Sequence, residues 1–101
     1  MIEATFLMPT QYANDAKWAD LEAYLVREYG GCSRRDGVVG AWSDLETGVV
    51  HADTSREYRI ALEENGLPEL SICLSGAAVT FGQLCVYLTV SAESVYFVNR
   101  R

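Results

Sequence analysis

The side chains that could carry out chemistry gather in the middle of the chain. His51 is the sole histidine, which excludes a metal site built on several histidines, and Asp53 follows it two residues later. On a strand the two would point the same way. A catalytic triad could be built from a nucleophile such as Cys32, with His51 as base and Asp53 as the residue that orients it. Nothing in the sequence brings Cys32 there, so the favoured interpretation is an exposed or hydrogen-bonded histidine on a strand.

A set of polar and aromatic residues forms the candidate contacts to a ligand or partner, and no residue is predicted to be catalytic or to bind metal. The run from Asp53 to Glu57 is the densest polar cluster, and it falls where we expect a strand to bend. We expect Trp42 and Tyr58 to pair across neighbouring strands, in the core or as a cleft wall. Gln83 is expected to cap a helix end. The candidates are Trp42, His51, Asp53, Arg56, Tyr58 and Gln83.

A second polar segment could hold an anion. Arg34 and Arg35 follow Gly31, Cys32 and Ser33, and small residues with two guanidinium groups can bind a phosphate or a carboxylate. The segment lacks the spacing of the thiol phosphatase loop and the lysine of the nucleotide P-loop. A solvated loop is therefore the favoured interpretation.

Composition limits the partners. The 101 residues include 8 basic and 14 acidic ones, a net charge of -6, which repels nucleic acid and anionic membranes. No stretch approaches the roughly 20 apolar residues of a membrane span, and no export signal is visible. The three cysteines, Cys32, Cys73 and Cys85, fit reduced thiols. We therefore expect a cytoplasmic protein with no cofactor.

Hydrophobic periodicity predicts the first strand and the first helix. Residues 2–8 form a short apolar strand that stops at Pro9. From Asn14, which can cap a helix, apolar residues recur at spacings of three and four up to Tyr29. Gly30 provides the stop.

A hairpin follows between residues 38 and 62. Val38–Trp42 reads as one strand after a polar loop at 33–37, and Asp44–Gly48 reads as the turn. A long returning strand begins at Val49, and we expect it to be bent or bulged near Asp53 and Thr54.

The stretch 70–81 permits two interpretations. Its apolar residues follow the spacing of a helix facing a core, with Pro68 in the first turn. The alternative is a hairpin turning at Ser75 and Gly76, since a glycine inside a helix costs about 1 kcal/mol relative to alanine. We favour the helix. Strands at 84–90 and 95–98 complete the chain.

This order predicts a single α+β domain over residues 1–101. It is the ferredoxin-like βαββαβ plan, an antiparallel sheet with two helices on one face and an extra C-terminal strand.

One resemblance accompanies this plan. The pattern DG-x-x-G-x-W at residues 36–42, Ser55 with Glu57, and FGQ at residues 81–83 resembles a family of small bacterial proteins of unknown function. Members of that family tend to place an acid directly after the glutamine, where this chain has Leu84. The resemblance implies a ferredoxin-like fold and carries no established activity.

With no catalytic motif in view, the sequence favours a non-enzymatic interaction module that binds a protein partner, self-associates as a homodimer, or both. Ile72 and Val79 support self-association, since they fall outside the core-facing stripe of the second helix. An enzyme is the less favoured class.

Two alternatives stay open. One is a small-molecule-binding protein or small enzyme that uses the cleft between sheet and helices, with His51, Arg56, Tyr58 and Gln83 as its polar groups. The other is an acidic inhibitor from a phage or mobile element that blocks a nucleic-acid-processing enzyme.

Overall fold

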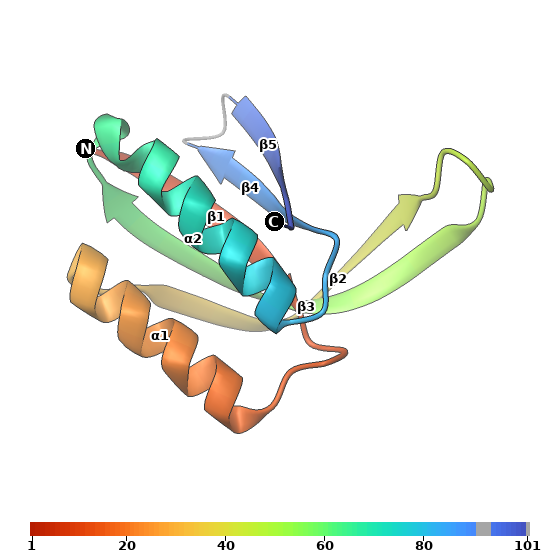
Figure 1. Cartoon of the computed structure of the whole chain (residues 1–101), viewed down its shortest axis with the longest axis horizontal. Helices are drawn as coiled ribbons and strands as arrows, with labels where there is room; N and C mark the ends of the chain where they lie inside the picture. Colours follow the sequence, from red (N-terminus) through yellow and green to blue (C-terminus); the bar gives the residue numbers. More distant parts are fainter. Residues whose placement is uncertain (91–93, 101) are drawn as a thin grey trace.

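The chain folds into a five-stranded antiparallel sheet with two helices on one face, as the computed structural model shows for residues 1–90 and 94–100 (Figure 1). The strand order is β2-β3-β1-β4-β5, which confirms the predicted ferredoxin-like plan with its added strand. The elements are β1 (Ile2–Pro9), α1 (Asp15–Tyr29), β2 (Ser33–Ser43), β3 (Val50–Leu62), a 3-10 turn (Glu64–Gly66), α2 (Leu67–Thr80), β4 (Cys85–Val90) and β5 (Ser94–Asn99).

Both helices begin and end where the sequence places their signals. The Asn14 side chain accepts a hydrogen bond from the Lys17 amide at 2.9 Å, and Gly30 ends α1 with a φ of 80°. The stretch 70–81 is helical, so the hairpin alternative is wrong. Among the described residues, no helix has the length and apolarity that crossing a membrane requires.

The core lies between the sheet and the two helices. Trp18 of α1 contributes to it, with its ring centroid 4.8 Å from that of Phe81 and 6.3 Å from that of Tyr58. These aromatic rings and the surrounding aliphatic side chains fill the layer in which a ligand cleft was expected. The other buried apolar residues are Ala4, Phe6, Met8, Leu21, Leu25, Ile60, Leu62, Leu70, Leu74, Ala78, Val86, Leu88 and Val90.

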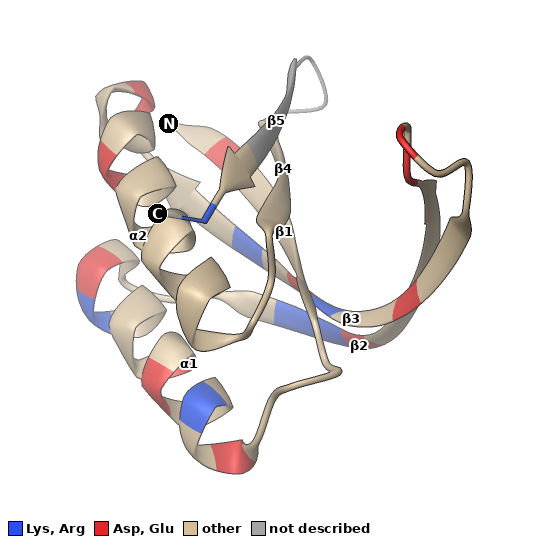
Figure 2. Ribbon diagram, turned by 45° about the vertical axis from the view of Figure 1, so that its right-hand side comes forward, with Lys and Arg blue, Asp and Glu red and all other residues tan. Residues whose placement is uncertain are grey.

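The outer half of the β2–β3 hairpin projects beyond the rest of the sheet. β1 ends at Pro9 opposite Ser55, so residues 36–54, which we call the arm, have no third strand beside most of their length. Figures 1 and 2 show the arm curving away from the side that carries the helices. The arm is acidic, because the sequence has no lysine or arginine between Asp36 and Ser55.

A β-bulge marks the point where the arm begins. Arg35 pairs with Glu57 and Val38 pairs with Ser55, so β2 carries one more residue than β3 over this interval. Gly37 allows it, with a φ of 70°. Figure 2 shows β3 bending as it enters the arm, as predicted, whereas the register of the two strands places the bulge in β2. The loop expected at 33–37 is wrong, because those residues belong to β2.

Candidate functional site

The face of the sheet that the helices do not cover carries a row of polar side chains. On β3 the even-numbered Tyr58 and Ile60 are buried beneath the helices. Since neighbouring residues on a strand point to opposite sides, Asp53, Glu57 and Arg59 lie on the uncovered side, which we call the open face.

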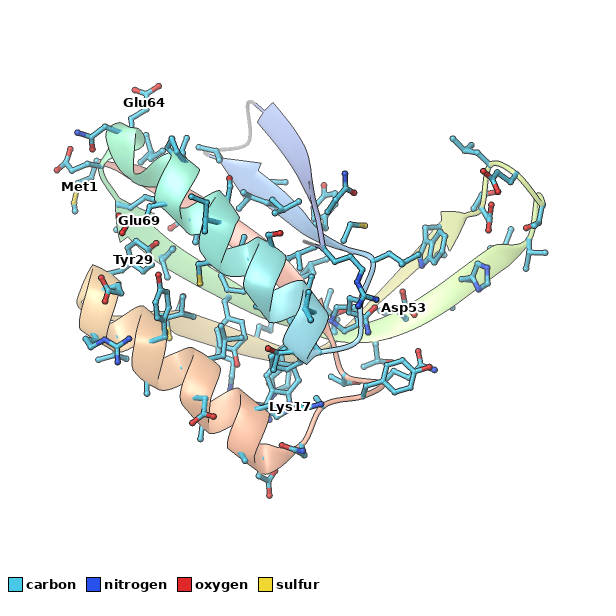
Figure 3. The ribbon with its side chains drawn as sticks, in the orientation of Figure 1. Met1, Lys17, Tyr29, Asp53, Glu64 and Glu69 are labelled. Atoms are coloured by element: carbon cyan, nitrogen blue, oxygen red, sulfur yellow. The ribbon has the colours of Figure 1, made fainter. Side chains whose placement is uncertain are left out.

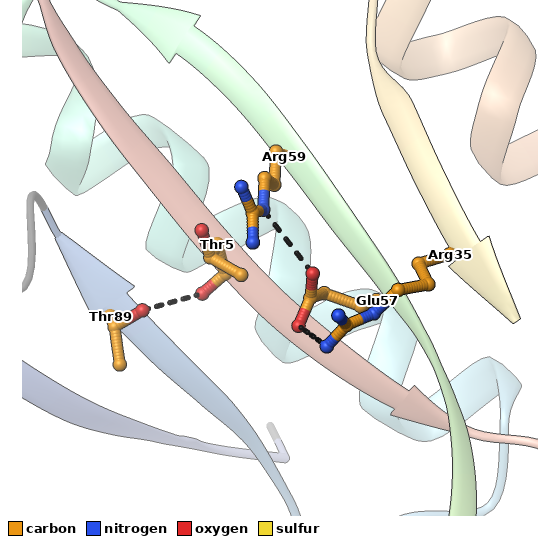
Figure 4. A network of polar contacts seen from close by, with 5 residues as sticks. All are labelled: Thr5, Arg35, Glu57, Arg59 and Thr89. Atoms are coloured by element: carbon orange, nitrogen blue, oxygen red, sulfur yellow. Dashed lines mark hydrogen bonds and ion pairs between the residues drawn. The ribbon is translucent and has the colours of Figure 1, made fainter. Parts of the chain in front are cut away.

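Three charged residues of the open face form one network, which we call the arginine–glutamate cluster (Figure 4). Glu57 accepts from Arg35 Nη2 with one carboxylate oxygen and from Arg59 Nε with the other, both at 3.2 Å. Its side chain is 12% exposed, whereas those of Arg35 and Arg59 are 66% and 49% exposed. Glu57 thus contacts two guanidinium groups whose side chains are largely exposed. An open hollow of about 280 Å³ lies here, lined by Ser33, Arg34, Arg35, Glu57 and Arg59.

A second group, the arm cluster, consists of Trp42, His51 and Asp53. The rings of Trp42 and His51 stack with centroids 4.5 Å apart and an interplanar angle of 22°. The indole Nε1 donates to Asp53 Oδ2 at 2.8 Å. Figure 3 shows Asp53 where β3 leaves the body of the protein. A hollow of about 380 Å³ adjoins it, lined by Thr10, Gln11, His51, Ala52, Asp53 and Thr54.

The bulge places the two clusters on the same face. Without the extra residue of β2, Trp42 would point to the side opposite Arg35. With it, Arg35 and Trp42 both lie beside the open-face residues of β3. Asp53 and Glu57 are four residues apart on that strand, a separation of about 13 Å.

Two of the predicted site residues lie on the other face. Arg56 binds Asp36 at 3.1 Å, and its guanidinium stacks over Trp18, 4.4 Å from the ring centroid. Tyr58 is fully buried, and burial raises its pKa to about 12, with Arg56 opposing the shift. The expected pairing of Trp42 with Tyr58 is wrong, because Tyr58 packs on Phe6 whereas Trp42 stands in the arm, half exposed.

Gln83 and Cys32 lie away from both clusters of the open face. The Gln83 amide donates to the carbonyl of Phe81 at 3.1 Å, and its backbone N–H donates to Ala78, so the prediction of a helix cap is confirmed. Cys32 precedes the start of β2, whereas His51 pairs with Trp42 near the other end of that strand. Burial raises the pKa of the Cys32 thiol, with Glu22 adding to the shift. The fold does not assemble the triad, since Cys32 lies before the start of β2 whereas His51 and Asp53 of β3 lie beside its other half.

The predicted site therefore divides: Trp42, His51 and Asp53 lie together, while Arg56, Tyr58 and Gln83 lie elsewhere. The sequence reasoning left Glu57 and Arg59 out of the candidates and treated Arg35 as part of a solvated loop. The alternation of Glu57 and Arg59 with the apolar Tyr58 and Ile60 was the available signal, since it marks one face of a strand. Within the described part of the chain, no three His, Cys, Asp or Glu side chains are placed to hold a metal ion.

Comparison with known proteins gives two solved structures of similar fold. No protein-family model and no curated protein match the chain. The first structure is a phage SAM lyase in complex with S-methyl-5'-thioadenosine, with a TM-score of 0.73 at 11% identity, covering 97% of this chain and 88% of that one. The second is a phage SAM lyase in the apo state, with a TM-score of 0.66 at 15% identity, covering 99% and 90%.

These likenesses concern the fold over nearly the whole chain, and they contradict the expectation of a non-enzymatic interaction module. That expectation depended on the absence of a recognisable catalytic motif. Such a search fails for a site whose residues meet only through the pairing of two strands, because no local catalytic motif describes it. The chain thus shares its fold with proteins described as phage SAM lyases, and its two clusters of polar side chains lie on the open face of the sheet.

Proposed function

We propose that this protein is an enzyme that cleaves S-adenosylmethionine and releases S-methyl-5'-thioadenosine. The observation that carries the proposal is the fold shared with the phage SAM lyase over at least 97% of the chain. We place the reaction on the open face, between the arm cluster and the arginine–glutamate cluster. We further propose that the protein acts in the cytoplasm, where its thiols stay reduced.

The charge of the protein supports this substrate. S-adenosylmethionine carries a sulfonium, an ammonium and a carboxylate, so it is a cation overall. A chain with a net charge of -6 attracts such a molecule over a long range. The acidic residues of the arm extend that attraction to the open face (Figure 2).

The arm cluster suits the adenosine part of the substrate. Trp42 presents a flat aromatic surface that is 49% exposed, on which a base can stack. One Asp53 oxygen accepts from Trp42 Nε1, and its other oxygen has no hydrogen-bond partner among the described residues. That oxygen can accept from the hydroxyls of a ribose. S-methyl-5'-thioadenosine keeps both the base and the ribose, so this contact serves substrate and product alike.

The proposed reaction breaks the bond between the sulfonium sulfur and the four-carbon amino-acid chain. The electron pair of that bond goes to sulfur, which becomes a neutral thioether. The departing carbon receives an electron pair from a nucleophile or from a neighbouring C–H bond whose proton is lost. Identification of the four-carbon product by mass spectrometry distinguishes these two routes. In both, the loss of the sulfonium charge weakens the attraction between the product and the acidic protein.

The test is direct conversion. Purified protein is incubated with S-adenosylmethionine, and S-methyl-5'-thioadenosine is quantified by liquid chromatography with mass detection against a protein-free control. We expect formation above the spontaneous rate, lowered about tenfold or more by Asp53→Asn, since a charge-assisted hydrogen bond contributes roughly 1.5–3 kcal/mol. Asp20→Asn, at an exposed position of α1 on the other side of the sheet, is the matched control and should leave the rate unchanged. A wild-type rate equal to the protein-free rate contradicts the proposal.

A further inference from the structure

The hollow beside the arginine–glutamate cluster is a positively charged place on an acidic protein. Of the charged groups that line it, Arg34 is occupied by Glu22 at 2.7 Å and by Asp36 at 3.4 Å. Arg35 and Arg59 share the single carboxylate of Glu57. The hollow is therefore lined by more arginine than acidic side chains, in a chain whose net charge is -6.

The geometry of the two guanidinium groups indicates which anion fits. Each guanidinium has five N–H donors, and Arg35 and Arg59 each use one of them on Glu57. Glu57 is nearly buried and contacts both arginines, so it holds their planes in place before a ligand arrives. A fixed guanidinium fork matches a planar carboxylate in a two-point contact. A polyanion is disfavoured, because the whole protein repels it.

We infer that this hollow is a carboxylate-binding subsite in which Arg35 and Arg59 hold the amino-acid end of the ligand. The inference rests on the proposed function and makes it more specific: the arm cluster binds adenosine, and the hollow binds the substrate's α-carboxylate. Glu57 is then a positioning residue, because it acts through the two arginines. The subsite separates substrate from product, since S-methyl-5'-thioadenosine has no carboxylate.

Calorimetric binding of the two compounds tests this assignment. In Arg59→Met and Arg35→Met we expect the Kd of S-adenosylmethionine to rise about tenfold or more, which corresponds to roughly 1.4 kcal/mol. The Kd of S-methyl-5'-thioadenosine should stay within about twofold. Arg27→Met is the matched control, because it removes the same charge from an exposed site on α1. Equal weakening of both compounds, or no weakening of either, overturns the inference.

Arg59→Lys is the variant to test if either methionine variant fails to fold. Lysine keeps the positive charge but lacks the two-point geometry of a guanidinium. We therefore expect weaker binding of S-adenosylmethionine and unchanged binding of S-methyl-5'-thioadenosine. Unchanged binding of both overturns the two-point contact.

A second measurement separates this inference from the proposed function. The Nε–H signal of Arg59, assigned by its absence in Arg59→Met, is followed by NMR during titration with methionine and with methioninol, which lacks the carboxylate. We expect methionine to shift the signal and methioninol to leave it in place. If only methionine shifts the signal while S-adenosylmethionine is neither bound nor cleaved, the carboxylate subsite is supported and the proposed function is contradicted. If both compounds act alike, the subsite falls whatever the enzyme assay gives.

Discussion

Tyr58 was a site candidate in the sequence, but in the structure it is a residue of the hydrophobic core. Its ring stacks on Phe6 with centroids 5.4 Å apart. Its hydroxyl is buried and has no hydrogen-bond partner among the described residues. Burial disfavours the ionised phenolate, which is why the pKa of Tyr58 is raised to about 12.

The variant Tyr58→Phe tests this account. At pH 7 we expect its free energy of unfolding to lie within about 1 kcal/mol of the wild type, because the lost hydroxyl makes no bond. In the wild type, the unfolded chain ionises Tyr58 near its ordinary pKa of about 10, whereas the folded protein resists ionisation until about 12. Stability is therefore lost as the pH rises through this window, and less is lost in the variant. Urea unfolding of both proteins at pH 7, 9 and 10.5 measures this loss of stability. An equal loss in the wild type and the variant would contradict a buried phenol.

Cys32 supports a second prediction at this scale. Because the thiol lies away from His51 and burial raises its pKa, we expect Cys32→Ser to release S-methyl-5'-thioadenosine within about twofold of the wild-type rate. Loss of turnover in a folded variant would restore the thiol mechanism.

At the scale of elements, the bulge of β2 decides which side chains meet on the open face. Gly37 holds the left-handed conformation there, whereas Gly40, three residues further along the same strand, has an ordinary backbone conformation. An added methyl group at either position meets no atom within 4 Å. The two glycines therefore differ in backbone strain alone.

We expect Gly37→Ala to lower the free energy of unfolding by about 1 kcal/mol, the cost of a left-handed conformation for a residue with a Cβ. The control Gly40→Ala should change it by less than about 0.5 kcal/mol. If the alanine instead shifts the register, Trp42 leaves the open face. Substrate binding would then fall more than stability does. Equal stability of the two variants would contradict the assigned bulge.

The same elements show what sequence reasoning can reach. Both helices were predicted, because Asn14, Gly30 and Pro68 act within one or two turns of their own position. The strand character of residues 33–37 was missed, because it depends on pairing with β3, more than twenty residues away. The arginine–glutamate cluster was missed for the same reason: Arg35 meets Glu57 through strand register, which no local pattern encodes.

At the scale of the whole molecule, the arm leaves apolar side chains uncovered. Val39 and Val50 are 72% and 70% exposed, and Leu45 at the tip is 98% exposed. A two-stranded hairpin of this kind is marginally stable in water without a further surface to pack on. We therefore propose that copies of the chain associate through their arms, in line with the oligomer expected from the sequence.

Light scattering coupled to size exclusion tests this association. We expect the wild type to have a molar mass above the 11.2 kDa of one chain, and the double variant Val39→Thr with Val50→Thr to shift towards the monomer. A control with Ile72→Thr on the outer face of α2 should not shift. A monomeric wild type at high micromolar concentration would contradict the association.

The two indoles of the chain report on different events. Trp18 of α1 is buried in the core, so its emission changes when the whole fold is lost. Trp42 stands in the arm against His51 and Asp53, so its emission changes when a base stacks there or the arm rearranges. Replacing either tryptophan by phenylalanine leaves a single tryptophan, whose emission can be excited apart from that of the tyrosines. The melting of the domain and the occupancy of the arm can then be followed separately without an added dye.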